Sequence, residues 1–577
     1  MSEAQTFDLV VVGSGAGGLA SAVVAAELGL SVVVLEKAPV WGGTTAWSGG
    51  WMWIPRNPLA VAAGIREDVD APRTYLRHEL GEHFDATRID AFLEHGPRMV
   101  EFFRDRTALQ FIDGNAMPDF HGRTPGAAPG GRSVCAAPFD ARELGDHLAT
   151  LRPPLDLLSL WGMGIASGAE LRHFLDAMRS PRSFAYAARR VMLHVKDLAS
   201  HRRALRLVNG NALAARLGKS AFDRGVRLVV DARVGEIVVE RGRVAGVVVD
   251  LPDGRRVMRA RRGVVLACGG FPHDADRQRA LFPPTPTGAD HWSAAPACNT
   301  GDGLRLGERA GGIVADDLAA AAAWAPVSLV PRRDGSFGHY PHLIERAKPG
   351  VIAVLRSGER FVNEADSYYD FMQALFERTP RGRTAEAWLV CDRQFIRRYG
   401  LGAVRPSPMP VAPFVRSGYV ARATTIEALA LACGIDAPAL AATVAAYNEH
   451  ARHGRDPAFG RGDTPYNRAG GDPAQRPNPC VAPIGRGPYY AVRVVPGSLG
   501  TFAGLRTDAS ARVLDGGGRA IAGLWACGAD MASIMGGRYP SGGITLGPAL
   551  TFAYLAAHDA AGTPLVRDSR KQAVTAN

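Results

Sequence analysis

The sequence has little cysteine, and its seven cysteines stand apart with no Cys-x-x-Cys pair. An odd, scattered set argues against a disulfide framework and against a zinc or iron–sulfur site. No run approaches about 18 consecutive apolar residues, so no transmembrane helix is expected. Residues 1–5 are polar and acidic, without the basic start and apolar stretch of a signal peptide. We therefore expect reduced thiols in a cytoplasmic protein.

Charged residues are also scarce, at 21% of the 577 residues, whereas 47% are hydrophobic. This is a globular composition, and its length fits roughly three to four ordinary domains or one large domain with a big insertion. Lys and Arg exceed Asp and Glu by 67 to 56, a formal net charge of +11. Such a charge suits nucleic acid, a membrane surface or anionic ligands. Because zinc-finger spacing and an aromatic RNA-binding signature are both missing, we do not expect nucleic acid as a partner.

What the sequence does contain is a nucleotide-binding pattern in its first forty residues. The apolar run Phe7–Val12 predicts a buried strand, and residues 13–18 (Gly-Ser-Gly-Ala-Gly-Gly) match G-x-G-x-x-G. Residues 19–30 have helical composition, and a second strand over 31–35 ends at Glu36. Strand, glycine turn, helix, strand and acidic residue together form the dinucleotide fingerprint.

Each part of this fingerprint has a physical role. Gly13 permits the tight turn, Gly15 lets the backbone approach a pyrophosphate, and Gly18 lets helix and strand pack closely. The helix N-terminus supplies amide donors for the phosphates, and Glu36 accepts from ribose hydroxyls. A small, hydroxyl-rich loop follows over residues 42–50 (GGTTAWSGG), whose amides and hydroxyls can surround a phosphate or an isoalloxazine ring. At this point either FAD or NAD fits.

The fingerprint followed by this loop resembles the flavoprotein superfamily of fumarate reductases and 3-ketosteroid dehydrogenases. The resemblance implies FAD. It also implies an α/β fold, in which a Rossmann-type FAD-binding domain carries an inserted α+β substrate domain. Members of the superfamily that bind FAD covalently do so through a His in this loop. This chain has no His there, so we expect non-covalent FAD.

Later segments fit the same organisation. A helix is expected over 212–223 and strands over 226–230, 234–240, 243–249 and 263–267, with a turn at Asp253-Gly254. Residues 300–303 (Thr-Gly-Asp-Gly) open a helix over 304–310 and resemble a superfamily flavin contact, as do residues 268–270 and 524–530. The expected cofactor-binding residues are Gly13, Ser14, Gly15, Ala16, Gly17, Gly18, Glu36, Lys37, Gly43, Thr44, Thr45, Ser48, Gly49, Gly50, Val234, Gly269, Gly270, Asp302, Gly528, Asp530, Thr545 and Leu546.

Composition divides the chain into three parts. Residues 1–281 are expected to form the first part of the FAD-binding domain, and residues 487–577 its second part. Between them, residues 282–486 are rich in Pro, aromatic and Arg residues and lose the regular strand–helix pattern, which predicts the inserted substrate domain. A helical excursion is expected over about 151–207. Nine Lys or Arg and many apolar residues fall within 172–206, a pattern that suits either a solvated helix face or a peripheral membrane contact.

Two motifs indicate the chemistry. Residues 360–371 (RFVNEADSYYDF) resemble the R-F-x-N-E-x-x-x-Y stretch of 3-ketosteroid Δ1-dehydrogenases, in which the tyrosine at the position of Tyr368 is the catalytic base. Residues 535–549 resemble their Y-P-x-x-G segment, where the groups at Tyr539 and Gly543 bind the ketone oxygen. A hydroxyl and an amide aimed at that oxygen stabilise the developing enolate, and a base takes the α-proton. The hydrogen on the next carbon leaves as hydride to the flavin.

Two departures leave the position of the new double bond open. The Δ1 enzymes carry an assisting tyrosine where Phe120 stands, and only the adjacent His121 could substitute. Ser541, two residues after Tyr539, matches a Y-x-S found in Δ4-(5α) dehydrogenases of 3-ketosteroids, so it is a secondary catalytic candidate. We expect a dehydrogenase of 3-ketosteroids or similar bulky apolar ketones, with Δ1 favoured and Δ4-(5α) as an alternative. Phe120 and Trp324 are expected to contact substrate.

Two rival functions stay open. A fumarate reductase-like enzyme needs groups for two carboxylates, but residues 500–504 lack the expected His, and Arg538 is displaced from the expected place. A non-enzymatic, surface-associated flavin protein is the second rival. The chain has no second dinucleotide fingerprint, so a quinone or another carrier is expected as electron acceptor rather than NAD.

Overall fold

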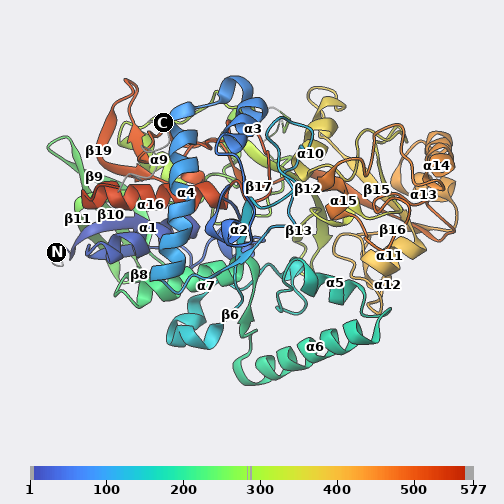
Figure 1. Cartoon of the computed structure of the whole chain (residues 1–577), viewed down its shortest axis with the longest axis horizontal. Coiled ribbons are helices and arrows are strands. Elements are labelled where there is room, and N and C mark those ends of the chain that lie inside the picture. The colour runs from blue at the N-terminus through green and yellow to red at the C-terminus, as the bar shows by residue number, and fades with distance from the viewer. Residues whose placement is uncertain (1–4, 283, 286, 288, 566–577) are drawn as a thin grey trace.

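The two largest β-sheets organise the described residues: the first lies at the left of Figure 1, and the second runs from its centre to its right. The computed structural model describes residues 5–282, 284, 285, 287 and 289–565. Among these residues, none of the helices combines the length and the hydrophobicity needed to cross a membrane.

The first sheet follows directly from the predicted nucleotide-binding pattern. Its central strand β1 (Gln5–Val12) pairs in parallel with β2 (Val32–Leu35) on one side and β11 (Gly254–Leu266) on the other. The order is β18-β19-β11-β1-β2-β8, completed by β8 (Arg227–Val229), β18 (Arg512–Leu514) and β19 (Ala520–Ala526). The central strands read as continuous apolar runs because both faces of a parallel sheet are covered.

Helices cover this sheet from segments far apart in the sequence. α1 (Ala16–Glu27) packs against α7 (Asn209–Phe222) and against α16 (Leu546–Ala561), and α16 also contacts α4 (Ala86–Arg106). Figure 1 shows α1 and α16 side by side, with α4 crossing in front of them. A side chain at Gly18 would place its Cβ 1.9 Å from the Gly13 carbonyl oxygen, so only glycine allows α1 to lie this close to the preceding turn.

The strand predictions are confirmed, with one difference in length. β9 (Arg233–Glu240) and β10 (Arg243–Leu251) form the expected antiparallel pair. β11 begins at Gly254 instead of residue 263, because the Asp253-Gly254 turn returns the chain into an antiparallel pairing with β10. The same strand then continues beside β1, so one long strand serves two neighbours.

The second sheet lies in the region predicted as the inserted domain, and it is antiparallel. Its order is β13-β12-β17-β15-β14, with β16 also on β17. The strands are β12 (Ala322–Pro331), β13 (Phe337–Pro341), β14 (Val351–Val354), β15 (Ala387–Asp392), β16 (Ala421–Ala423) and β17 (Tyr489–Thr501). The helices around it include α10 (Tyr368–Glu377), α11 (Arg393–Tyr399), α12 (Ala412–Arg416), α13 (Ile426–Cys433), α14 (Ala437–Ala451) and α15 (Pro465–Gly470). This mixed α/β architecture confirms the predicted fold class.

The domain boundaries stay predictions, and one pairing bears on them. β17 pairs with β12, β15 and β16 of the second sheet, although residues 487–577 are predicted to return to the FAD-binding domain. We propose that the return follows β17, after residue 501.

The excursion over 151–207 is helical only in its second half. α5 (Ala169–Leu175) and α6 (Pro181–His201) are present, whereas residues 151–168 contain only a short 3-10 turn, Asp156–Leu158. Pro153 and Pro154 explain the difference, since proline disfavours helical backbone before it and removes a donor. The remaining elements are α2 (Pro58–Ala62), α3 (Ala71–Leu80), α8 (Ala275–Leu281), α9 (Asp302–Arg309), β3 (Trp51–Trp53), β4 (Phe111–Asp113), β5 (Ser133–Ala136), β6 (Phe139–Asp140) and β7 (Arg206–Leu207).

Candidate active site

One cavity of about 1190 Å³ draws its lining from both halves of the fold. The turn after β1, the loop 42–50, the end of β11 and the start of α16 contribute one part of its wall. Residues at the start of α10 and on α15 contribute another part. The predicted nucleotide site and the predicted catalytic residues therefore belong to one continuous space.

The glycine turn after β1 leaves an open approach to its backbone. Gly13 has φ +102°, and a Cβ there would lie 2.2 Å from the Ala267 carbonyl oxygen. At Gly15 the nearest atom to such a Cβ is the Thr45 hydroxyl, at 3.7 Å. This amide-lined turn at the N-terminus of α1 can accept a pyrophosphate at short range.

Glu36 and Lys37 stand at the end of β2, on the cavity wall. The Glu36 carboxylate accepts from the Ser14 hydroxyl at 2.6 Å and from the Ala38 amide at 2.9 Å. Lys37 donates to Thr300 and Asp302, at 2.8 and 2.5 Å, and so joins this strand to the start of α9. A carboxylate fixed here is placed to accept from ribose hydroxyls.

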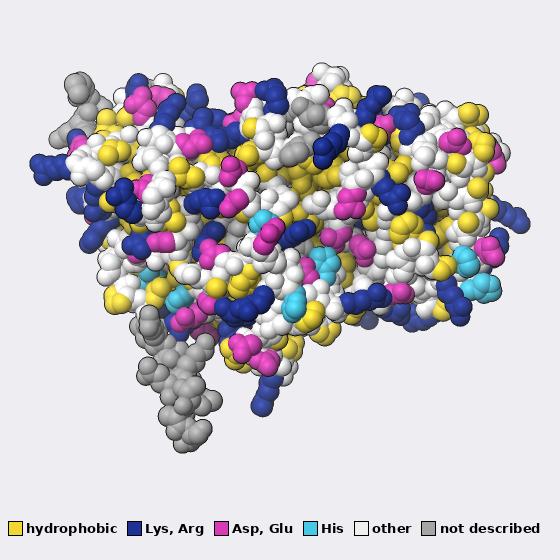
Figure 2. Space-filling model, turned by 90° about the horizontal axis from the view of Figure 1, so that it is seen from above, with side chains coloured by type: hydrophobic (Ala, Val, Ile, Leu, Met, Phe, Trp, Pro, Cys, Tyr) yellow, Lys and Arg dark blue, Asp and Glu magenta, His cyan; other side chains and the backbone are white. Residues whose placement is uncertain are grey.

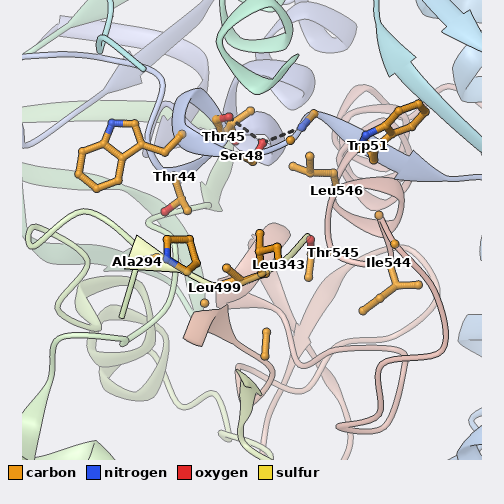
Figure 3. A pocket seen from close by; sticks show the side chains of 18 of the residues that line it. Thr44, Thr45, Ser48, Trp51, Ala294, Leu343, Leu499, Ile544, Thr545 and Leu546 are labelled. Carbon is orange, nitrogen blue, oxygen red and sulfur yellow. Dashed lines mark hydrogen bonds between the residues drawn. The ribbon is translucent and has the colours of Figure 1, made fainter. Parts of the chain in front are cut away.

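The loop 42–50 presents hydroxyl groups to the cavity. Figure 3 shows Thr44, Thr45 and Ser48 on one side, with Thr545 and Leu343 on the other. The Thr45 hydroxyl accepts from the Ala16 amide at 2.8 Å, and Asn299 donates to Thr44 at 2.9 Å. The loop is thereby tied to both α1 and the segment before α9.

These residues fit FAD. The donor set offers amides at two helix N-termini, a carboxylate after β2 and a hydroxyl-rich loop, and the start of α16 directs its positive dipole end at the cavity. Histidine is missing among the described lining residues, and non-covalent binding stays a prediction.

Most of the predicted cofactor residues line the cavity, and three do not. The lining residues are Gly13, Ser14, Gly15, Ala16, Gly17, Glu36, Lys37, Gly43, Thr44, Thr45, Ser48, Gly49, Gly50, Val234, Gly269, Asp302, Gly528, Thr545 and Leu546. Gly18 lies behind the turn, packed on Gly13, and Gly270 also lies outside the lining, with its amide donated to Asp530. Asp530 is fully buried, and its carboxylate accepts from the amides of Cys268 and Gly270, at 2.5 and 3.0 Å. It fixes the wall from behind instead of facing the cavity.

The two predicted catalytic tyrosines meet inside this cavity. Tyr368 is the first residue of α10, after the capping residue Ser367, whose hydroxyl accepts from the Asp370 amide. Its ring lies edge-on to that of Tyr539, with centroids 5.0 Å apart. Burial and the neighbouring Tyr539 hydroxyl raise the pKa of Tyr368 well above its ordinary value, and burial raises the pKa of Tyr539 to about 12.

Gly543 lies on the same wall as Tyr539. Its φ is +100°, and a Cβ there would lie 2.7 Å from the Trp53 amide nitrogen, so both the conformation and the space require glycine. Its carbonyl accepts from the Trp53 amide at 3.1 Å. Among the described residues, none of the backbone hydrogen bonds in turns and loops uses the Gly543 amide, which leaves a donor for a ligand.

Phe120 separates the tyrosines from the surrounding loops. Its ring stacks on Tyr539 with centroids 5.7 Å apart and meets Tyr368 edge-on at the same separation. The preceding Asp119 is buried, and it accepts from the Trp53 indole at 2.8 Å and from Arg132 at 2.6 Å. The loop therefore presents Phe120 from a fixed backbone.

His121 lies outside the cavity lining and joins two helices. Its Nδ1 lies 2.5 Å from Glu79 of α3, and its Nε2 lies 2.9 Å from Asp370 of α10. Although burial opposes the charged form, the two carboxylates raise the pKa of His121 to about 10. It therefore does not replace the missing phenol at Phe120, but positions α10 as a charged bridge.

Two predicted site residues lie outside the cavity. Trp324, expected to contact substrate, is buried against Phe282, His291 and Phe376, because β12 turns this side chain away from the cavity. Ser541 is 1% exposed and lies beneath the wall, so it does not reach the space beside Tyr539.

Tyr466 is a residue that the sequence analysis missed. It lines the cavity from α15, and its ring centroid lies 4.5 Å from that of Phe120. Its short helix lies in the region without regular pattern, so nothing in the sequence motif pointed to it. It supplies an aromatic hydroxyl beside the position where the expected tyrosine is missing.

Comparisons with known proteins agree with this geometry. A family model described as an FAD binding domain matches residues 8–546. A 4-oxocyclohex-2-ene-1-carboxylate 5-dehydrogenase from Sinomonas cyclohexanicum is 39% identical over 97% of this chain and 95% of its own length. A 3-oxosteroid 1-dehydrogenase from Mycobacterium tuberculosis is 38% identical over 96% of this chain and 98% of its own length.

A solved structure is also similar throughout. It is a 3-ketosteroid Δ1-dehydrogenase from Sterolibacterium denitrificans in complex with 1,4-androstadiene-3,17-dione. The TM-score is 0.89 at 37% sequence identity, and the match covers 97% of this chain and all of that one.

Proposed function

Since this chain belongs to the family of FAD-dependent 3-ketosteroid dehydrogenases and their relatives, we propose that it introduces a double bond next to the ketone of a 3-ketosteroid or a similar bulky ketone. The observation that carries this proposal is the meeting of Tyr368, Tyr539 and Gly543 on one cavity wall. The activities of the similar 3-ketosteroid dehydrogenases favour the Δ1 position, with Δ4-(5α) as the alternative.

The roles follow from chemistry. The Tyr539 hydroxyl and the Gly543 amide donate to the ketone oxygen, so negative charge that develops there is stabilised. Tyr368 takes the α-proton as phenolate. When bound, FAD supplies the acceptor for the hydride from the neighbouring carbon. Phe120 and Tyr466 give the substrate an aromatic wall and exclude water from the reacting atoms.

Anaerobic bleaching of the flavin tests the proposal. Purified protein with FAD is mixed in separate cuvettes with androst-4-ene-3,17-dione, its 5α-saturated counterpart and succinate. We expect loss of the flavin band with a steroid, and the steroid that bleaches identifies Δ1 or Δ4-(5α). Bleaching by succinate alone, or reoxidation of dithionite-reduced protein by fumarate alone, would instead support the fumarate reductase-like alternative.

The proposal also covers the electron acceptor that reoxidises the reduced flavin, and the surface on which the protein would meet it. We infer a quinone or similar carrier as acceptor, supported by the single dinucleotide fingerprint. A cytoplasmic protein that touches a membrane surface through residues 172–206 would meet such a carrier there. α6 supports this contact, since it lies at the edge of the molecule and exposes Phe184, Met192 and Val195 (Figure 1).

A further inference from the structure

The cavity also carries a group of cations that the proposed chemistry does not use. Arg172 of α5, Lys348, Arg398 of α11 and Arg468 of α15 all line it. We call these four residues the basic rim. The first and last of them, Arg172 and Arg468, are about 300 residues apart in the sequence, and the fold brings all four to the same cavity as Tyr368 and Tyr539.

Carboxylates compensate only part of this charge. Asp472 pairs with Arg398 and accepts from the Tyr399 hydroxyl at 2.6 Å. Other carboxylates of the lining pair elsewhere: Asp176 lies 3.8 Å from Arg179, and Glu364 lies 2.7 Å from Arg360. No ion pair is formed by Arg172, Lys348 or Arg468 within the part of the chain that the structure describes.

The hydrogen bonds of these cations leave donors free for a ligand. The Lys348 ammonium donates to the Gly471 carbonyl at 2.8 Å, and Arg468 donates to the Gly462 carbonyl at 3.2 Å. A carbonyl satisfies one donor but does not neutralise the charge. Burial lowers the pKa of Lys348, which shows that this ammonium lies away from bulk water. A partly buried cation of this kind is stabilised by an anion in the cavity.

The buried cation on the lining, Arg346, already donates its hydrogen bonds to the protein backbone. Arg346 is buried and donates to the backbone carbonyls of Glu364 and Asp366, at 2.8 and 3.2 Å. It fixes the backbone that leads into Tyr368. Among the described lining residues, the other cations without an ion pair are the partly buried Lys348 and the exposed Arg172 and Arg468.

We propose that the basic rim binds a carboxylate of the substrate, so that the preferred substrate is a ketone that also carries an acidic group. This inference rests on the proposed function, because the ketone end is taken to lie at Tyr539 and Gly543. Two sources supply the chemistry: a steroid acid with its carboxylate on the side chain, and a compact monocyclic oxo acid.

Matched acid and ester pairs test the rim. The holoenzyme is assayed for kcat/KM by anaerobic flavin reduction with 3-oxopregn-4-ene-20-carboxylate and its methyl ester, and with 4-oxocyclohexanecarboxylate and its methyl ester. We expect an acid to exceed its ester by about tenfold or more, since a charge-assisted contact contributes about 1.5–3 kcal/mol. The pair that shows the preference identifies the source.

Two single variants test which residues cause the preference for the acid over the ester. Arg172→Gln and Arg468→Gln should remove most of the acid's advantage while the ester rate stays unchanged, which also shows that each variant is folded. Arg393→Gln is the control, because Arg393 is exposed on α11 and lies outside the lining. The control should keep the full preference.

The outcomes separate the two proposals. Equal rates for acid and ester in both pairs, or a preference that survives both variants, overturns the rim while leaving ketone dehydrogenation in place. Flavin that no ketone reduces, androst-4-ene-3,17-dione included, overturns the proposed function itself.

Discussion

At the scale of single residues, the site is defined by the state of two phenols. Both Tyr368 and Tyr539 have pKa values raised by burial, so little phenolate exists at neutral pH. A tyrosine that must accept a proton is then active in a small fraction of molecules.

We therefore expect kcat to rise as the pH increases from 7 towards 10. The sign follows from the base: a raised pKa moves the reactive form to alkaline pH. Steady-state kinetics with an artificial electron acceptor, with the flavin band monitored for loss of cofactor, would check this. A profile that is flat over this range would show that Tyr368 is not the titrating base.

Removing either hydroxyl should cost activity without loss of flavin. Tyr368→Phe should lower kcat by about 10²- to 10⁴-fold, the usual contribution of a general base. Tyr539→Phe should lower it by about 10²- to 10³-fold, as for loss of one oxyanion donor. Tyr489→Phe, on β17 and outside the cavity lining, is the comparison variant. Unchanged kcat in Tyr368→Phe would contradict the assigned role.

The glycine turn follows from the dinucleotide fingerprint, whereas the two tyrosines and Gly543 follow from the resemblance of their motifs to those of 3-ketosteroid dehydrogenases. The structure brings these residues to one cavity, and their roles stay predictions. The sequence could not predict that Trp324 and Ser541 face away from the cavity, since the direction of a side chain is set by strand register and packing. It missed Tyr466, the basic rim and the two carboxylates around His121 because these groups meet only through tertiary contacts.

At the scale of elements, His121 connects the loop of Phe120 to α10. The imidazolium lies between Glu79 and Asp370, so it fixes α3 and the first turn of α10 relative to each other. The base Tyr368 stands on that same turn.

The pH dependence of stability should reveal this bridge. The pKa of His121 is raised to about 10 in the folded protein, above the ordinary value of about 6.5. Its stabilising contribution is then complete below pH 6.5 and is lost as the pH rises towards 10. Thermal unfolding of wild type and His121→Gln should differ most at pH 6 and converge by pH 10. The exposed His453→Gln serves as control and should follow wild type; a gap that does not narrow would disprove the charged bridge.

α6 is the second element with a consequence of its own. Phe184 and Met192 are 58% and 66% exposed on a helix that also carries Arg and Lys. We expect the protein to sediment with anionic lipid vesicles, and Phe184→Ser/Met192→Ser to reduce the bound fraction severalfold. Leu431→Ser, at an equally exposed apolar position on α13, should have no effect. Equal binding by both variants would place any contact elsewhere.

At the scale of the whole molecule, charge is dispersed. On the face seen in Figure 2, Lys and Arg side chains are interspersed with Asp and Glu and do not form one patch. The excess of basic residues is thus of most interest where it is local, at α6 and at the basic rim.

Because the cavity wall is built from distant segments of the chain, bound FAD should stabilise the whole fold. The cavity wall combines residues from the first fifty positions, the middle of the chain and positions 527–549. Removing FAD should lower the melting temperature, and saturating FAD at about 1,000 times its Kd should restore about 4 kcal/mol. Calorimetry of the apoprotein with and without added FAD measures this, with AMP as the control ligand. A melting temperature unaffected by FAD would contradict a site built from the whole chain.

The order of strands in the first sheet determines when, during translation, each strand gains its neighbours. β1 emerges first from the ribosome, but its neighbour β11 follows about 250 residues later, and β19 more than 500 residues later. The glycine turn after β1 is therefore translated long before its opposite wall exists. The wall of the cavity is complete only when residues 527–549 have been translated, so we expect chains that stop before them to lose most of their affinity for flavin.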